Sequence, residues 1–327
     1  MIDRESVPVT VVDPLTVAWT PGPGIESAPE LARLRQALES AGRSLLAIRD
    51  ERLEADWTWP GADPDIGIDV RYGFYRIFEM LEFARADAVR SLAATGAERP
   101  AGAHRGAAST VARWSLHGLL LPLADADLDR DPGGGEWTIR ETLGHMLSSQ
   151  RSYGRFTAWF LTQAPTPGAP IPDELGDELP ARFDEAAGSV TDVRMRLDDL
   201  LDLAMARLGG FTDDQLLVPA RWSGGQVTVG FRIGRWASHL REHTIQVEKT
   251  LAMLGRPPSE VERLVRLLFE AYGRLEESVA GMGPDQLRTR PAGGRSAADV
   301  LTEAARDLAE LPPGIVAAAG SRGDSTG

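Results

Sequence analysis

The sequence of 327 residues lacks cysteine altogether. This absence excludes a disulfide framework, a thiolate metal site and a cysteine nucleophile, so any thiol chemistry needs a thiol from outside the chain. Lysine occurs once, as Lys249, among 35 basic residues, and aromatic residues make up only 6% of the chain. The formal net charge of −13 argues against a non-specific nucleic-acid binder, which would show a basic stripe.

Long hydrophobic runs are also missing. No stretch approaches the roughly 20 apolar residues of a membrane-spanning helix. The first residues, 1–6, lack the basic and apolar regions of a signal peptide. Hydrophobic residues nevertheless account for 43% of the chain, which is enough for a sizeable core. We expect a soluble cytoplasmic protein with a small-molecule substrate and no nucleic-acid or membrane partner, for which a homodimer is one assembly to consider.

Apolar residues recur at steps of three and four through most of the chain, which predicts α-helices. Only the segment 219–229 has the pattern of a hairpin. The expected fold class is all-α, with a central four-helix bundle that includes a long Pro-rich crossover at 164–191. The expected divisions are an irregular arm at 1–27, an N-terminal helix pair at 28–105, a bundle at 106–258, a C-terminal helix pair at 259–311 and a disordered tail at 312–327.

An internal repeat links the middle of the chain to its end. The segments 128–138 and 287–296 share a leucine, a proline four residues later, a glycine pair and a hydroxyl residue that caps a helix. Aligned on the cap, His145 corresponds to Glu303. The repeat predicts that the flanking helix pairs form a second, degenerate bundle or cap without metal.

Histidine is scarce, and two of the five histidines stand four residues apart on the core-side face of a predicted helix about 230–254. Such a pair can reach one divalent metal ion if a third ligand comes from another helix, although this spacing alone is a weak signal. The alternative is a pair of buried histidines that are satisfied by hydrogen bonds. The five are His104, His117, His145, His239 and His243.

The order of elements adds to this pattern. A Gly-Gly-x-Trp-Thr turn before a helix with His145, a long crossover, and then His239-x-x-x-His243-x-x-Gln246 followed by Gly-Arg-Pro-Pro resembles the DinB/YfiT-like family over about 106–258. That family consists of four-helix bundles and includes mycothiol-dependent maleylpyruvate isomerases. The resemblance implies that His145, His239 and His243 hold one divalent metal ion, zinc or nickel.

Three imidazoles leave at least one metal position open, as in catalytic sites. The resemblance therefore implies a metal-dependent thiol S-transferase or isomerase, which activates a low-molecular-weight thiol of the mycothiol or bacillithiol type. A metal-dependent hydrolase that uses bound hydroxide is one alternative, and a non-catalytic metal-binding bundle is another. His239-x-x-Glu242-His243 also has the form of inverzincin peptidases, but the distant glutamate ligand and mixed scaffold of those enzymes are not found.

Further residues are candidates for lining the site. His117 and His145 lie at similar distances from the Gly-rich turn, so antiparallel helices would place them at similar depth. Gln246 shares a helix face with His243 and could bind water or a ligand, and Glu242 flanks that face. The hairpin and the crossover are expected to border the open end of the bundle. The residues expected nearest an acidic or thiol-bearing ligand are Arg221, Trp222 and Arg232.

Overall fold

The computed structural model describes residues 28–59, 67–162, 164, 166–177, 184–223 and 225–321. Among them the chain is helical apart from turns and two short hairpins, which confirms the all-α class. The hairpins pair β1 (Asp56–Trp57) with β2 (Ile68–Asp69) and β3 (Pro219–Trp222) with β4 (Gly225–Thr228). The helices are α1 (Pro29–Leu45), η1 (Asp50–Arg52), α2 (Val70–Ala94), α3 (Ala101–Gly106), α4 (Ala108–Leu120), η2 (Asp125–Asp129), α5 (Ile139–Thr162), α6 (Asp173–Asp177), η3 (Asp184–Ala186), α7 (Val190–Leu208), α8 (Asp213–Leu216), α9 (Val229–Met253), α10 (Glu260–Val279), α11 (Pro284–Arg288) and α12 (Ala297–Gly320).

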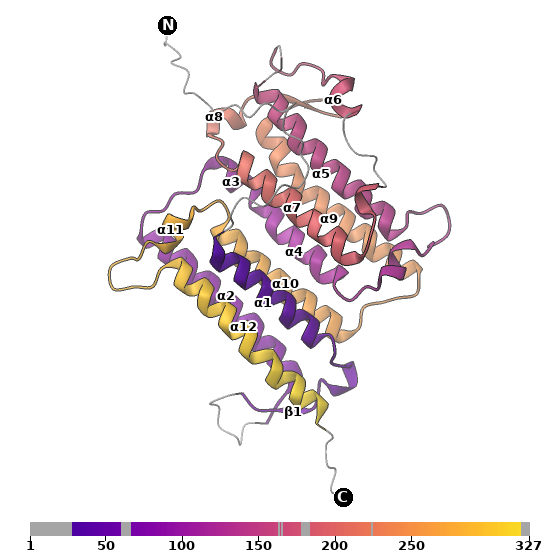
Figure 1. The fold of residues 1–327 in the computed structure, drawn as a ribbon, viewed down its shortest axis with the longest axis vertical. Helices are drawn as coiled ribbons and strands as arrows, with labels where there is room; N and C mark the ends of the chain where they lie inside the picture. Colours follow the sequence, from indigo (N-terminus) through magenta and orange to yellow (C-terminus); the bar gives the residue numbers. More distant parts are fainter. Residues whose placement is uncertain are drawn as a thin grey trace, which may run out of the picture.

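The central bundle consists of α4, α5, α7 and α9 (Figure 1). Its apolar faces meet in one core that includes Leu143, Leu197 and Trp236. The long connection between α5 and α7 carries the short helices α6 and η3. This is the expected four-helix bundle with a crossover, and burial of its apolar seam is the main source of its stability.

A second bundle consists of α1, α2, α10 and α12, so it joins the beginning of the chain to its end. Figure 1 shows the indigo and purple helices beside the orange and yellow ones. Their buried faces form a separate core that includes Phe74, Phe269 and Leu301. The expected degenerate second bundle is therefore confirmed.

The two bundles have the same internal arrangement. The helices α10, α12, α1 and α2 correspond in turn to α4, α5, α7 and α9, because the same pairs are in contact in each bundle. A hairpin precedes both α9 and α2, and both helices begin at a side-chain cap, Thr228 and Asp69, which accept from the backbone N–H of Phe231 and Tyr72. The second bundle is thus a permuted copy. Its first two helices in the chain, α1 and α2, correspond to the last two helices of the central bundle.

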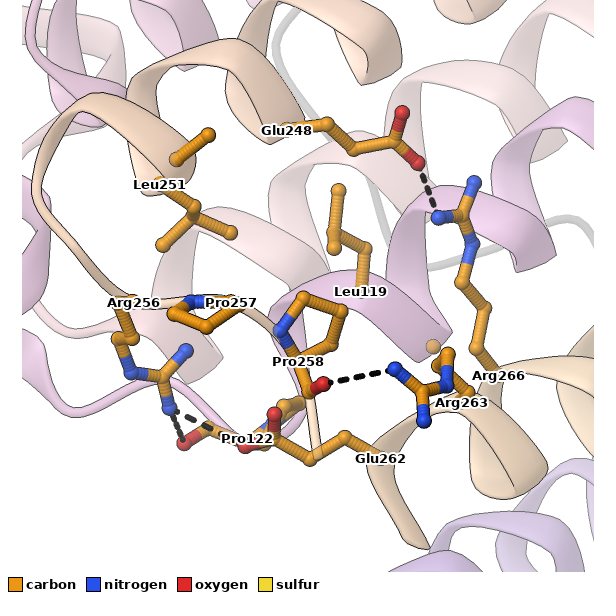
Figure 2. A pocket seen from close by; sticks show the side chains of 12 residues that line it. Leu119, Pro122, Glu248, Leu251, Arg256, Pro257, Pro258, Glu262, Arg263 and Arg266 are labelled. Atoms are coloured by element: carbon orange, nitrogen blue, oxygen red, sulfur yellow. Dashed lines mark hydrogen bonds and ion pairs between the residues drawn. The ribbon is translucent and has the colours of Figure 1, made fainter. Parts of the chain in front are cut away.

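The bundles meet along α4 and α10. Gly118 of α4 faces the backbone of α10, where an added Cβ would lie 2.9 Å from Cα of Arg266, and Gly273 of α10 faces Val111 of α4 in the same way at 3.1 Å. These reciprocal glycines let the two antiparallel helices approach closely. A cavity of about 220 Å³ lies beside this junction, and Figure 2 shows how Arg266 and Glu248 form an ion pair across it.

A buried ion network closes the junction between the bundles. Glu276 of α10 accepts hydrogen bonds from Arg35 of α1 (2.7 Å), from Trp114 of α4 (3.1 Å) and from Arg113 of α4. Arg113 also contacts Asp202 of α7 at 2.7 Å. Each bundle therefore supplies charges of both signs, which satisfies groups that would be costly to bury alone.

Some boundaries differ from the expected ones. The end of the expected helix pair at 28–105 also contains α3, because the N-terminal amides of α3 bond to the carbonyl groups of Phe211 and Gly209 after α7. The expected tail at 312–327 is helical as far as Gly320, because the apolar face of α12 continues through buried Ile315. The expected arm at 1–27 lies outside the described residues, as does 322–327.

The described helices do not meet the requirements of a membrane span. None of them combines the length and the apolar character that crossing a bilayer demands.

Candidate metal centre

Two helices of the central bundle bring three histidines together. Thr138 and Glu141 form the expected capping box at the start of α5, with Thr138 N–H donating to Glu141 at 2.8 Å and Glu141 N–H donating to the Thr138 hydroxyl at 3.1 Å. This start places His145 two turns inside α5. His239 and His243 come from α9, one turn apart on the face that packs on α5.

The ring nitrogens of these histidines converge. Nε2 of His239 lies 3.3 Å from Nε2 of His145 and 3.0 Å from Nε2 of His243. One ligand atom from each residue lies within 4.8 Å of the others, and among the described residues this is the group of histidine and acidic side chains that could hold a metal ion.

The spacing fits a common ligand. With metal–nitrogen bonds of about 2.05 Å, nitrogens 3.0 Å and 3.3 Å apart subtend angles of about 94° and about 107° at one ion. Those angles lie between octahedral and tetrahedral values, so zinc and nickel are both compatible with them. Both distances from His239 are therefore compatible with one shared divalent ion.

Gln246 fixes the tautomer of His243. Its Oε1 lies 2.8 Å from Nδ1 of His243, and an amide oxygen only accepts hydrogen bonds. Nδ1 of His243 therefore carries the proton, and the lone pair of Nε2 faces His239 and His145. Gln246 was expected to bind water or a ligand, whereas the structure places it behind a histidine, where it orients the ring.

His239 is the most enclosed of the three, with 3% of its surface exposed. Burial, together with His243 and His145, lowers the pKa of His239 to about 3. The imidazole is consequently neutral at physiological pH, which is the form that binds a metal ion. Its Nδ1 is buried without a hydrogen-bond partner in the part of the chain that the structure describes.

An aromatic wall and a cavity lie next to the histidines. The ring of Tyr153 on α5 packs edge to face on His239, with centroids 5.3 Å apart, and on Trp222 of β3, with centroids 4.6 Å apart. Behind this wall is a cavity of about 400 Å³ that Arg232, Arg221 and Ile171 also line. The crossover, the hairpin and α9 thus border one cavity beside the histidines.

Residues 108–247 match the family model of the DinB superfamily, which covers α4 to α9 and all three histidines. We refer to this matching segment as the DinB domain. Among solved structures the chain is similar to YfiT from Bacillus subtilis, described as a probable metal-dependent hydrolase with an unusual four-helix bundle topology. That similarity has 19% identity and a TM-score of 0.35, and it covers 63% of this chain and 99% of that chain. No match is found among curated proteins.

Two residues that were candidates for lining the site lie elsewhere. Glu242 is exposed on α9 and pairs with Arg235 at 2.6 Å, since its position falls outside the face toward α5. His117 of the DinB domain is buried on another side of α4. There its Nε2 contacts Asp198 at 2.9 Å, and its Nδ1 accepts from Arg194 at 2.9 Å. Burial lowers the pKa of His117, so a neutral histidine satisfies both partners and serves the packing of the bundles.

Tyr153 was expected to be an ordinary surface or groove residue, whereas it packs against the histidine group. Burial raises the pKa of this tyrosine to about 12, so its hydroxyl keeps its proton beside the histidines. The signal available in the sequence was its position two turns beyond His145 on the same helix.

The second bundle has the corresponding positions but not the histidines. Counted from the caps Thr228 and Asp69, His239 corresponds to Met80 and His243 to Ala84, and Glu303 takes the place of His145. Met80, Ala84 and Glu303 line a cavity of about 390 Å³ in that bundle. The second bundle thus has a cavity at the positions that the three imidazoles occupy in the DinB domain.

Proposed function

We propose that the DinB domain binds one divalent metal ion, zinc or nickel, through His145, His239 and His243, and uses it to transfer a low-molecular-weight thiol to an electrophilic small molecule. The observation that carries the proposal is the convergence of three Nε2 atoms at spacings that suit one ion. A bound divalent ion would supply Lewis acidity, which lowers the pKa of a thiol at its open position.

The thiol has to come from outside the chain, because the chain has no cysteine. Resemblance to a family that includes mycothiol-dependent isomerases supports a thiol of the mycothiol or bacillithiol type. The adjoining cavity of about 400 Å³ falls in the usual size range of small-molecule sites.

The chain's own residues prepare the site for that chemistry. Gln246 directs the Nε2 lone pair of His243 toward the other two histidines. Tyr153 and Trp222 form a wall that keeps water from one side of the histidine group, and the tyrosine hydroxyl remains a donor at neutral pH. A hydrolase, which transfers an acyl group to water, would need neither an added thiol nor a site that binds one.

The test begins with metal analysis of the purified full-length protein and of His243→Ala. We expect one zinc or nickel ion per chain in the native protein and none in the variant, which should stay helical by circular dichroism. The matched control is His104→Ala, because His104 is exposed and far from the group in sequence. Metal retention in His243→Ala would overturn the assigned ligand set.

Activity separates transfer from hydrolysis. We expect the zinc-loaded protein to accelerate conjugation of a thiol with the fluorogenic electrophile monobromobimane, and His243→Ala to lose that rate. Hydrolysis of p-nitrophenyl acetate without any thiol, at a rate that depends on the same histidines, would replace the proposal with a metal-dependent hydrolase. A metal-bound protein inactive in both assays would assign the domain to the non-catalytic class.

A further inference from the structure

Arg232 of α9 is a buried cation whose hydrogen-bonding capacity is only partly used. Its side chain is 2% exposed. Nε donates to the hydroxyl of Thr157 at 3.0 Å, and Nη1 donates to the carbonyl oxygen of Arg221 at 2.6 Å. Nη2 is buried and has no hydrogen-bond partner within the described residues. Both partners are neutral, so neither offsets the positive charge.

Within the described part of the chain, the surroundings of Arg232 are aromatic rather than acidic. The guanidinium carbon lies 5.5 Å from the ring centre of Trp222, 5.5 Å from that of Phe160 and 5.9 Å from that of Phe156. Burial lowers the pKa of Arg232 to about 10, which leaves the group charged at neutral pH. An unpaired charge in such a setting is costly, and an anion with two oxygens would complete its hydrogen bonds.

The unpaired guanidinium lines the cavity beside the histidines. Arg232 and His239 are seven residues apart on α9, which places them on one face of the helix and about 10 Å apart along its axis. Tyr153 joins the two ends, because it lines the cavity and packs on His239. A ligand whose anionic group meets Arg232 would therefore lie against Tyr153, the ring that also packs on His239.

The second bundle shows that the architecture does not need a cation at this place. The residue that corresponds to Arg232 is Gly73, since each lies four residues after the cap of its helix. The residue that corresponds to Thr157 is Ile315, since each lies 19 residues after the cap of its helix. An added Cβ on Gly73 would lie 2.8 Å from Cγ1 of Ile315, so the two positions are in contact there as well. The apolar pair packs where the histidines are absent, and the polar pair occurs where they are present.

We propose that Arg232 binds the carboxylate of a small molecule in this cavity, so that the DinB domain selects carboxylate-bearing substrates. The role of the ligand as a substrate rests on the proposed function, whereas its binding to Arg232 does not. The carboxylate can belong to the electrophile or to the thiol, and the shared chemistry is a two-oxygen anion against the guanidinium fork.

The first arm of the test uses metal-free, full-length protein and a pair of probes that differ in charge. Benzoate and benzamide are titrated while tryptophan fluorescence is recorded, since Trp222 lines the cavity. We expect benzoate to bind more tightly than benzamide, and Arg232→Met to weaken benzoate about tenfold or more without changing benzamide. The control Arg241→Met removes an equal charge from an exposed position on the same helix and should change neither affinity.

A second variant guards against simple loss of structure. The double variant Arg232→Gly with Thr157→Ile reproduces the apolar pair of the second bundle and should fold with native helicity. It should likewise lose the preference for benzoate. Equal affinity of the native protein for benzoate and benzamide, or retention of the benzoate preference in either variant, would overturn the proposal.

The second arm uses zinc-loaded protein with mercaptoacetate and mercaptoacetamide. Tighter binding of mercaptoacetate than of mercaptoacetamide, lost in Arg232→Met, assigns the carboxylate to the thiol. If the two thiols bind equally while benzoate still binds more tightly than benzamide, the carboxylate belongs to the electrophile. If the protein does not bind zinc, the proposed function is wrong, but the result of the first arm can still be interpreted. A benzoate preference in the first arm with no zinc bound would therefore identify an anion site without a metal enzyme.

Discussion

Replacement of Gln246 by leucine tests whether the histidine group is oriented for a metal ion. Oε1 of Gln246 is 2.8 Å from Nδ1 of His243, so this contact decides which nitrogen of His243 carries the proton. Without it, the neutral ring can carry the proton on Nε2 instead, where it blocks coordination. The leucine remains an aliphatic side chain of similar volume but carries neither the acceptor nor the amide donor.

The expected magnitude follows from two effects. If the two tautomers became equally populated, the competent fraction of His243 would fall about twofold, which alone is a weak effect. The ring also loses its anchor and part of its basicity, and loss of such outer-shell partners lowers metal affinity about 10- to 100-fold. We therefore expect zinc to bind Gln246→Leu more weakly by about 1.4 to 2.7 kcal/mol.

The measurement is a competition for zinc between the full-length protein and a chromogenic chelator at neutral pH. Gln246→Glu retains the acceptor and should bind zinc as tightly as the native protein or more so. Gln226→Leu, an exposed glutamine in the hairpin, is the matched control and should have no effect. Unchanged zinc affinity in a helical Gln246→Leu would refute the argument, because His243 would then not depend on this contact for its orientation.

Two further predictions concern the junction between the bundles. Glu276→Ala should lower the free energy of unfolding by about 3 to 5 kcal/mol in urea titrations, because Arg113 and Arg35 would stay buried after losing one of their carboxylate partners. The exposed Glu136→Ala should cost less than about 1 kcal/mol, and equal losses would contradict the network. Since the folded-state pKa of His117 lies below its unfolded value of about 6.5, the stability it contributes is complete above that pH and declines below it by up to about 1.4 kcal/mol per pH unit. Urea titrations of metal-free His117→Asn between about pH 6.5 and 5 should show a shallower slope than the native protein, and an identical slope would count against a buried neutral histidine.

Much of the fold follows from local signals in the sequence. The capping box of Thr138 and Glu141 and the spacing of His239 and His243 are properties of single helices, so the sequence alone predicts them. The repeated turn predicted a second bundle because a helix pair with one apolar face must bury it against another. The end of α12 was missed because Pro312 normally stops a helix, whereas packing of the residues beyond it outweighs the two lost amide donors.

The candidate site was predictable only as far as helix faces determine it. A helical wheel gives the side of a helix on which His117 lies, but α4 contacts helices of both bundles and is buried on nearly every side. The wheel therefore could not distinguish the side of the three histidines from the side that faces Asp198 and Arg194. The contact of Gln246 with His243 depends on rotamers. The lack of a carboxylate near Arg232 among the described residues depends on every helix around it.

The comparison between bundles also separates what the fold requires from what the chemistry requires. Both copies keep the hairpin, the capped helix and a cavity of similar size, so these features belong to the architecture. The differences lie along one face of the capped helix, where His239 corresponds to Met80 and Arg232 to Gly73. Apolar residues at both places show that the helices pack without imidazole or guanidinium. The three imidazoles and the unpaired cation therefore have to be explained by what the cavity binds rather than by the stability of the bundle.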